Sequence, residues 1–176
     1  IGVRLVGSEM CIRDRLNPIV EDDFIDRDLT MVDYISEITK SFKETSKKNF
    51  IMNFDQYSNS LKISKSIEIV YGLRNFIGNA NKFSKSKVFI NIKSDNEITE
   101  VIIEDDGEGY PKDVLRNIGE PYNKSSIKSK SGLGLGIFIG KTLLEKNYAN
   151  ILCRNSQTRS GAEVKIRWNN KDLLNL

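Results

Sequence analysis

The sequence contains no histidine, and this absence excludes a large group of mechanisms. Without an imidazole the chain has no histidine base and no histidine ligand for a metal ion. Cysteine is nearly as scarce, since only Cys11 and Cys153 are present. The two lie far apart without the spacing of a zinc site, which favours a reduced, cytosolic setting over a disulfide framework.

The chain also lacks a long hydrophobic run and a strong excess of either charge. No apolar stretch approaches the roughly 18 residues of a membrane span, and no signal-peptide pattern is present. The net charge is only +3 with the lysines scattered, so nothing indicates nucleic acid or an anionic membrane as the main partner. At 176 residues, 39% hydrophobic and 29% charged, the composition is that of one globular domain.

The ends of the chain differ from its middle. Residues 1–15, "IGVRLVGSEMCIRDR", have no sustained periodicity and a different composition from the Lys/Asn/Ile/Ser-rich remainder. We interpret them as a non-native, artefactual segment, with a short ordered extension as the alternative. Residues 16–28 are predicted to be an acidic connector. We expect the globular domain at 29–170 and a short tail at 171–176.

Hydrophobic periodicity predicts alternating helices and strands. We expect helices in the ranges 29–48, 65–84 and 135–147, with a helical turn at 111–119. We expect strands at 49–54, 87–94, 97–106, 149–156 and 162–168. This combination favours a two-layer α/β sandwich, in which a mixed, mostly antiparallel sheet is covered on one face by helices.

A glycine-rich stretch, "GLGLGIFIGKT" from Gly132 to Thr142, is typical of a phosphate-binding loop that opens a helix. It is not a P-loop, because the position of the first glycine is Leu135. It is not a dinucleotide fingerprint either, because Ile137 and Ile139 occupy the third-glycine positions. Glycines at a helix start still leave backbone N–H groups free for phosphate oxygens, although a flexible loop is the alternative.

Two polar clusters accompany this stretch. Asn75 and Asn79 lie four residues apart on one predicted helix, so both amides project from the same face, with Lys82 close behind. Asp105 begins "DDGEG", where an apolar strand breaks into a glycine turn that can present a carboxylate to a ligand. A polar helix edge and a plain acidic turn are the alternatives for each cluster taken singly.

The order of these motifs is more specific than any one of them. The motifs "N-x-x-x-N-A-x-K-F", "D-x-G-x-G", "E-P-Y" and "G-x-G-L-G-I" occur in that order. The pattern resembles the N, G1, F and G2 boxes of the ATP-binding catalytic domain of sensor histidine kinases, which has the Bergerat ATPase fold. The resemblance covers 29–168, and "GEPY" with "GAEVKIRW" looks most like the redox-responding regulator subgroup.

The resemblance implies a role for each motif residue. Asp105 would accept the adenine amino group above the turn of Gly107 and Gly109. Asn79 would bind Mg²⁺ on the phosphates of ATP, with Asn75 beside it and Lys82 near the phosphate chain. The range Pro111–Ser131 would be a mobile ATP lid, whose Lys124, Lys128 and Lys130 either screen phosphate charge or are merely solvated. The remaining implied nucleotide contacts are Tyr122, Lys130, Gly132, Leu133, Gly134, Leu135 and Gly136.

The resemblance also implies phosphoryl transfer rather than fast hydrolysis. Hydrolysing relatives have a glutamate at the position of Asn75, and a neutral amide cannot take a proton from water. Glu68, nearly two helical turns earlier, should not substitute for it. The expected activity is therefore that of a protein histidine kinase, with an anti-sigma-type serine kinase and a non-catalytic docking module as alternatives.

The expected phosphoacceptor histidine is absent, so we interpret the chain as a catalytic fragment. The implied partners are the phosphoacceptor, or dimerisation, helices of the same sensor kinase and a response regulator. The parent protein is expected to be a homodimer, with this domain in the cytoplasm and an anchor in the inner membrane an open alternative.

Overall fold

The computed structural model describes residues 29–63, 66–116 and 135–175. Within them lie β1 (Leu29–Thr30), α2 (Met31–Lys43), β2 (Asn49–Phe54), β3 (Lys62–Ile63), α3 (Ile67–Phe83), β4 (Lys87–Ser94), β5 (Ile98–Asp105), α4 (Lys112–Arg116), α5 (Leu135–Lys146), β6 (Asn150–Asn155), β7 (Ala162–Asn169) and α6 (Asn170–Leu174). The proposed artefactual segment and acidic connector lie outside the described residues. No helix in the described ranges has the length and hydrophobicity needed to cross a membrane.

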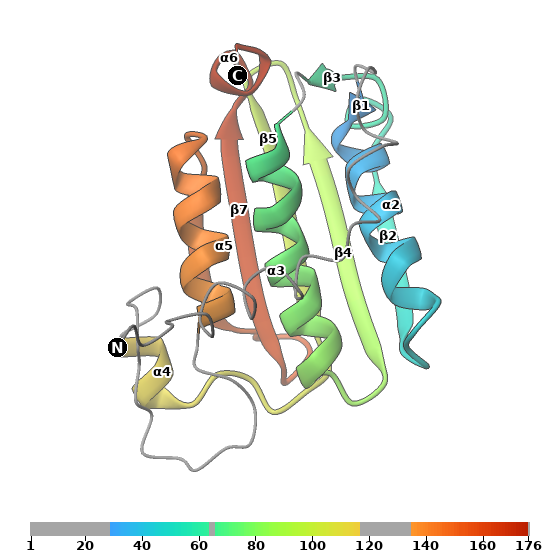
Figure 1. The fold of residues 1–176 in the computed structure, drawn as a ribbon, viewed down its shortest axis with the longest axis vertical. Coiled ribbons are helices and arrows are strands. Elements are labelled where there is room, and N and C mark those ends of the chain that lie inside the picture. Colours follow the sequence, from blue (N-terminus) through green and yellow to red (C-terminus); the bar gives the residue numbers. More distant parts are fainter. Residues whose placement is uncertain (1–28, 64–65, 117–134, 176) are drawn as a thin grey trace, which may run out of the picture.

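The architecture is a five-stranded sheet in the order β2-β4-β5-β7-β6, with α2, α3 and α5 against one face (Figure 1). Strand β2 is parallel to β4, and the other neighbouring strands are antiparallel. The register aligns Ile90, Ile103 and Val164 across three strands, and all three are buried. Because side chains alternate along a strand, one face of the sheet is apolar and the helices cover it. The predicted two-layer α/β sandwich is confirmed.

Local signals determine where the helices begin. At the start of α2, Thr30 Oγ1 accepts the backbone N–H of Asp33 at 3.1 Å, while Asp33 Oδ2 accepts the backbone N–H of Thr30 at 2.8 Å. This reciprocal capping box satisfies two N–H groups that a helix start would otherwise leave unpaired. At the start of α3, the Ser66 hydroxyl caps the N–H of Ile69.

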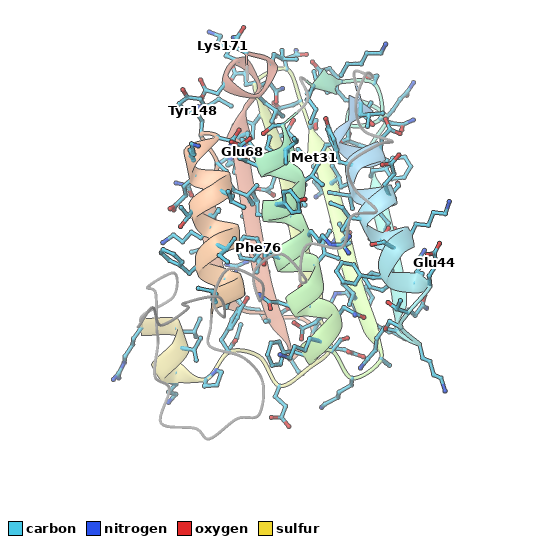
Figure 2. The ribbon with its side chains drawn as sticks, viewed as in Figure 1. Met31, Glu44, Glu68, Phe76, Tyr148 and Lys171 are labelled. Atoms are coloured by element: carbon cyan, nitrogen blue, oxygen red, sulfur yellow. The ribbon has the colours of Figure 1, made fainter. Side chains whose placement is uncertain are left out.

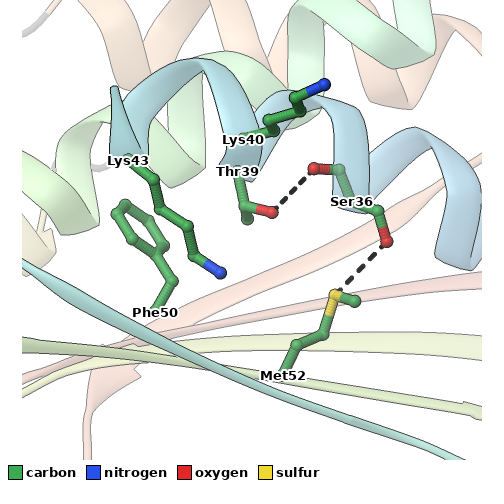
Figure 3. Close-up of a pocket in the computed structure, with 6 residues that line it drawn as sticks. All are labelled: Ser36, Thr39, Lys40, Lys43, Phe50 and Met52. Carbon is green, nitrogen blue, oxygen red and sulfur yellow. Dashed lines mark hydrogen bonds between the residues drawn. The ribbon is translucent and has the colours of Figure 1, made fainter. Parts of the chain in front are cut away.

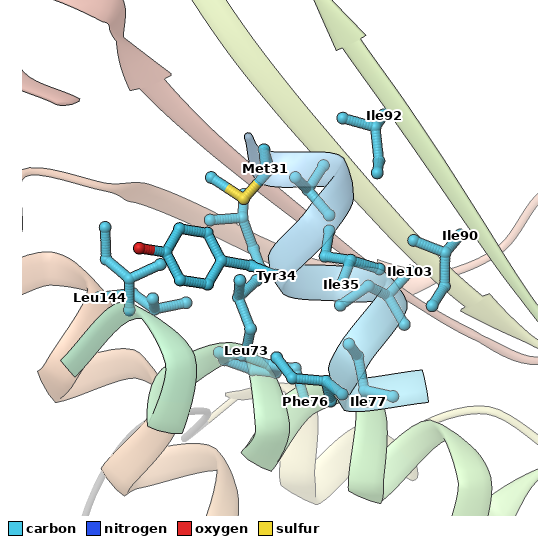
Figure 4. Close-up of a cluster of buried hydrophobic side chains, with 14 of the residues drawn as sticks. Met31, Tyr34, Ile35, Leu73, Phe76, Ile77, Ile90, Ile92, Ile103 and Leu144 are labelled. Atoms are coloured by element: carbon cyan, nitrogen blue, oxygen red, sulfur yellow. The ribbon is translucent and has the colours of Figure 1, made fainter. Parts of the chain in front are cut away.

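The core lies between the helices and the sheet (Figure 4). Met31, Tyr34 and Ile35 of α2 meet Leu73 and Phe76 of α3, and each is at most 2% exposed. Labelled charged residues such as Glu44 and Lys171 point outward, away from this core (Figure 2). The helical stripes expected from the sequence are therefore the buried faces.

Helices α3 and α5 approach each other at two glycines. A Cβ on Gly72 would lie 2.5 Å from Leu144 Cγ, and one on Gly140 would lie 3.2 Å from the carbonyl oxygen of Gly72. A side chain at Gly72 would have to displace Leu144, and one at Gly140 would crowd Phe76, Asn75 and the backbone of α3. Gly140 in "GKT" is thus a helix-packing glycine, consistent with the rejection of a P-loop.

Two features were not predicted. Strands β1 and β3 pair Leu29 with Ile63, but two-residue strands are too short to give a periodic signal. Helix α6 lies where the sequence indicated the end of the domain and a tail, and its Leu173 is fully buried. Asn170 connects α6 to the sheet because its Oδ1 accepts the hydroxyl of buried Thr99 at 2.8 Å.

Candidate nucleotide site

Those residues singled out from the sequence that the structure describes gather toward one end of the domain. Helix α3 ends there, β5 ends there, and α5 begins there (Figure 1). These three element ends come from distant parts of the chain. Their convergence follows from the topology, because β5 runs antiparallel to β4 and α5 packs along α3.

Asp105 is the last residue of β5 and is only 3% exposed. Its Oδ1 accepts the backbone N–H of Gly107 at 2.8 Å and that of Ala162 at 3.2 Å. Burial outweighs these bonds and raises the pKa of the carboxyl above its ordinary value. Within the described residues Oδ2 makes no hydrogen bond, so it remains able to accept one from a ligand.

The turn after Asp105 is packed against backbone on two sides. A Cβ on Gly107 would collide with the carbonyl oxygen of Phe83, the last residue of α3. A Cβ on Gly161 would collide with the carbonyl oxygen of Asp105. The carboxylate is therefore held between the end of α3 and the start of β7. Gly161 was not among the predicted site residues.

Asp106, the second carboxylate of "DDGEG", connects the end of β5 to the loop between α3 and β4. Its Oδ1 accepts the backbone N–H groups of Lys85, Ser86 and Lys87 at 2.8, 3.0 and 3.1 Å, and its Oδ2 accepts the Ser86 hydroxyl at 2.7 Å. Partial burial opposes ionisation, but these hydrogen bonds prevail and hold the pKa of Asp106 well below its ordinary value. The two neighbouring aspartates thus have different tasks: Asp106 closes the α3–β4 loop, and Asp105 keeps one oxygen without a hydrogen bond from the described residues.

The paired amides of α3 lie against the start of α5. A Cβ on Gly136 would lie 3.4 Å from both Oδ1 and Nδ2 of Asn79 and 3.6 Å from Oδ1 of Asn75. Asn75 donates its Nδ2 to the carbonyl oxygen of Tyr71 at 2.8 Å. Asn79 Nδ2 is buried without a hydrogen-bond partner among the described residues. A buried, unpaired amide is costly, and such groups often mark a place where a ligand binds.

The remaining predicted residues divide into two groups. Lys82 is exposed, with its ammonium 5.4 Å from the ring centroid of Phe83, and it makes no described hydrogen bond to Asn75 or Asn79. Leu135 is the exposed first residue of α5. The expected sites at Tyr122, Lys124, Lys128, Lys130, Gly132, Leu133 and Gly134 lie outside the described residues. Of the expected lid, the helical turn is confirmed as α4.

A separate pocket of about 190 Å³ lies between α2 and β2 (Figure 3). It is lined by Ser36, Thr39, Lys40, Lys43, Phe50 and Met52. None of these residues belongs to α3, β5 or α5. This pocket is therefore distinct from the candidate nucleotide site.

A buried carboxylate, an unpaired amide and a glycine at a helix start make a site suited to a nucleotide. Residues 64–172 match the histidine kinase-, DNA gyrase B- and HSP90-like ATPases, and the chain belongs to this family. The Bergerat-type assignment made from the motif order is confirmed.

Among individual proteins, the chain is similar to sensor kinases. The chain is 35% identical to the sensor histidine kinase RegB of Cereibacter sphaeroides over 57% of its own length and 26% of RegB, which supports the resemblance to the redox-responding subgroup. It is 32% identical to the sensor protein kinase PilS of Pseudomonas aeruginosa over 51% of its own length and 18% of PilS. The chain thus spans about a quarter or less of these curated relatives.

Solved structures support the fold. The mycobacterial sensor histidine kinase MprB aligns with a TM-score of 0.66 at 19% identity, covering 80% of this chain and 96% of MprB. Full-length ShkA in complex with AMPPNP aligns with a TM-score of 0.65 at 19% identity, covering 81% of this chain and 30% of ShkA. At these identities the likeness concerns the fold alone.

Proposed function

We propose that this domain binds Mg²⁺-ATP and transfers the γ-phosphoryl group to a histidine on the dimerisation helices of a sensor kinase. The observation that carries the proposal is the convergence of Asp105, Asn79 and Gly136 at one corner. The free oxygen of Asp105 suits an amino group of adenine, and the start of α5 suits phosphate oxygens. The AMPPNP bound to ShkA, which has the same fold, agrees with this proposal.

The donor set fits magnesium. The described residues contain no cluster of three or more His, Cys, Asp or Glu side chains, so they do not form an all-protein metal cage. Mg²⁺ commonly binds through one or two protein oxygens, several waters and the phosphates of its substrate. Asn79 would supply its Oδ1 as the protein oxygen. When bound, Mg²⁺ would neutralise the charge that develops on the phosphates.

Transfer to another protein is favoured over hydrolysis because the described residues place no base beside Asn79. Asn75 is a neutral amide whose N–H₂ is committed to the carbonyl oxygen of Tyr71. Glu68 lies in the first turn of α3, roughly 16 Å from Asn79 along the helix axis, and pairs with Lys146 at 3.7 Å. Positioning and charge neutralisation are what phosphoryl transfer needs most, and this site offers both.

The acceptor must come from another chain or segment, because this sequence has no histidine. The dimerisation helices of the parent sensor would provide it. Those helices would also make the parent protein a homodimer, and a response regulator would receive the phosphoryl group. An inner-membrane anchor for the parent protein belongs to the same proposal.

The test is phosphotransfer in trans. The domain is mixed with the phosphoacceptor module of its own full-length protein and with γ-labelled ATP, and the product is treated with acid. An acid-labile phosphoprotein supports the proposal, because phosphohistidine hydrolyses in acid. An acid-stable product would point to a serine kinase instead. No labelled product, together with no magnesium-dependent ATP binding, would indicate a docking module and contradict the proposal.

A further inference from the structure

Asn155, the last residue of β6, makes a pair of hydrogen bonds outside the predicted motifs. Its Oδ1 accepts the backbone N–H of Tyr110 at 2.6 Å, and its Nδ2 donates to the carbonyl oxygen of Tyr110 at 3.0 Å. One side chain thus satisfies both backbone polar groups of a residue 45 positions earlier. The amide acts like one rung of a β-ladder between β6 and the loop after β5.

The clamped residue is in a sensitive position. Tyr110 follows Gly109, whose φ of +79° lies in the left-handed region that favours glycine. A Cβ on Gly109 would lie 2.7 Å from Asn155 Oδ1. The amide clamp therefore requires a glycine at position 109, because a side chain there would displace the amide.

The Tyr110 side chain is anchored to the same strand. Tyr110 and Cys153 are both partly buried and pack against the core. Burial raises the pKa of Tyr110 above its ordinary value and that of Cys153 to about 11, so both groups are neutral at physiological pH. Cys153 and Asn155 lie two residues apart, on one face of β6. Strand β6 thus pairs with the backbone of Tyr110 through Asn155 and places the Cys153 thiol beside the Tyr110 side chain.

We infer that Asn155 is a positioning residue for nucleotide binding, acting through Tyr110 on the turn below the base site. The inference rests on the proposed function. Gly107 fixes the beginning of this turn by donating to Asp105, and Asn155 fixes its end at Tyr110. Only Glu108 and Gly109 lie between the two anchors. Without the clamp the turn would gain freedom that nucleotide binding must then remove.

The clamp should affect ATP binding more than folding. Asn155 is exposed, so when its amide is removed the polar groups of Tyr110 can pair with water and no buried group is left unsatisfied. Within the described part of the chain, Asn155 makes no hydrogen bond to Asn75, Asn79 or Gly136. We therefore expect a weaker affinity for ATP, and a higher KM, with little change in kcat at saturating ATP.

The experiment measures Mg²⁺-ATP binding by calorimetry for the wild type, Asn155→Ala and Asn155→Asp. Asn150→Ala is the matched control, because Asn150 is an exposed asparagine on the same strand whose side chain makes no described hydrogen bond. Loss of both bonds should weaken ATP binding about five- to thirtyfold. Asn155→Asp keeps the acceptor for the Tyr110 N–H, but its second oxygen would face the Tyr110 carbonyl oxygen acceptor to acceptor, so its affinity for ATP should also fall below that of the wild type. Amide hydrogen exchange should become faster around Tyr110 in Asn155→Ala and stay unchanged elsewhere in the sheet.

The outcomes separate this inference from the proposed function. If the wild type does not bind Mg²⁺-ATP, the proposed function fails and the inference with it. If the wild type binds and Asn155→Ala binds equally well, the inference alone is overturned. Faster exchange across the whole sheet, with an ATP loss no larger than the fraction unfolded, would also overturn it by assigning Asn155 a purely structural role.

Discussion

Replacing Asp105 with asparagine changes one charge while leaving the shape of the side chain intact. The retained Oδ1 can still accept the backbone N–H groups of Gly107 and Ala162. The second oxygen, which makes no described hydrogen bond, becomes an N–H₂ donor. We therefore expect Asp105→Asn to fold normally and to lose most of its affinity for ATP.

The stability effect has a definite sign. Burial raises the pKa of Asp105 in the folded state, so the folded protein binds this proton more tightly than the unfolded chain does. Folding stability then falls as pH rises from the ordinary value near 3.8 through the raised folded value. Asparagine does not titrate, so Asp105→Asn should be at least as stable as the wild type at pH 7.

The binding effect follows from the lost acceptor. A hydrogen bond to a charged group contributes about 1.5–3 kcal/mol, which corresponds to roughly ten- to 150-fold in the dissociation constant. The expected loss lies toward the upper end, because the new N–H₂ would face the adenine amino group donor to donor. Guanine presents a carbonyl oxygen at that position, so the preference for ATP over GTP should also narrow.

The assay is calorimetric titration of Asp105→Asn with Mg²⁺-ATP and with Mg²⁺-GTP at pH 7.5. Asp106→Asn is the matched control, since it neutralises the neighbouring carboxylate, which clamps the α3–β4 loop. The control should lose stability and keep its base preference. The reasoning is refuted if Asp105→Asn binds ATP as tightly as the wild type with an unchanged ATP:GTP ratio.

Three further predictions follow from neighbouring contacts. Asn79→Ala should abolish the magnesium dependence of ATP binding, measured with and without a chelator, without loss of stability, because it removes a buried unpaired amide. Gly140→Val should lower the free energy of unfolding in urea by about 1–3 kcal/mol or more, since even its Cβ would lie 3.1 Å from Asn75 Cβ. Asp106→Asn should cost about 1–3 kcal/mol at pH 7. Because the folded-state pKa of Asp106 is lowered, this difference should shrink in urea titrations as pH falls below its ordinary value of 3.8. Each prediction has its own contradicting result. An unchanged magnesium effect in Asn79→Ala would contradict the metal role of Asn79, and an unchanged free energy of unfolding in Gly140→Val would contradict the close helix packing. Equal stabilities of Asp106→Asn and the wild type at pH 7 would contradict the role of Asp106 in holding the α3–β4 loop.

The long, regular elements were predictable from the sequence for a physical reason. In α3 and β5 every second to fourth residue meets the same core, so burial imposes a period on the sequence. Local spacing likewise predicted that Asp105 lies where a strand ends and that Asn75 and Asn79 share a helix face. These features depend on residues close together in the chain.

The missed features depend on partners far away in the chain. Asn155 binds Tyr110 across 45 positions, and Ala162 binds Asp105 across 57. Nothing near Asn155 or Gly161 indicates those contacts, because a lone exposed asparagine or a loop glycine is common in turns. The short strands β1 and β3 could not be predicted for the same reason, since each has only two residues and is defined by its pairing with a distant segment.

The central claim is that Asp105, Asn79 and the start of α5 surround one nucleotide. The most direct measurement is a crystal structure of the domain with Mg²⁺ and a non-hydrolysable ATP analogue. It should place the adenine amino group within hydrogen-bonding distance of Asp105 Oδ2, with the metal ion on Asn79 Oδ1. A nucleotide bound elsewhere, or one whose base lies away from Asp105, would contradict the claim.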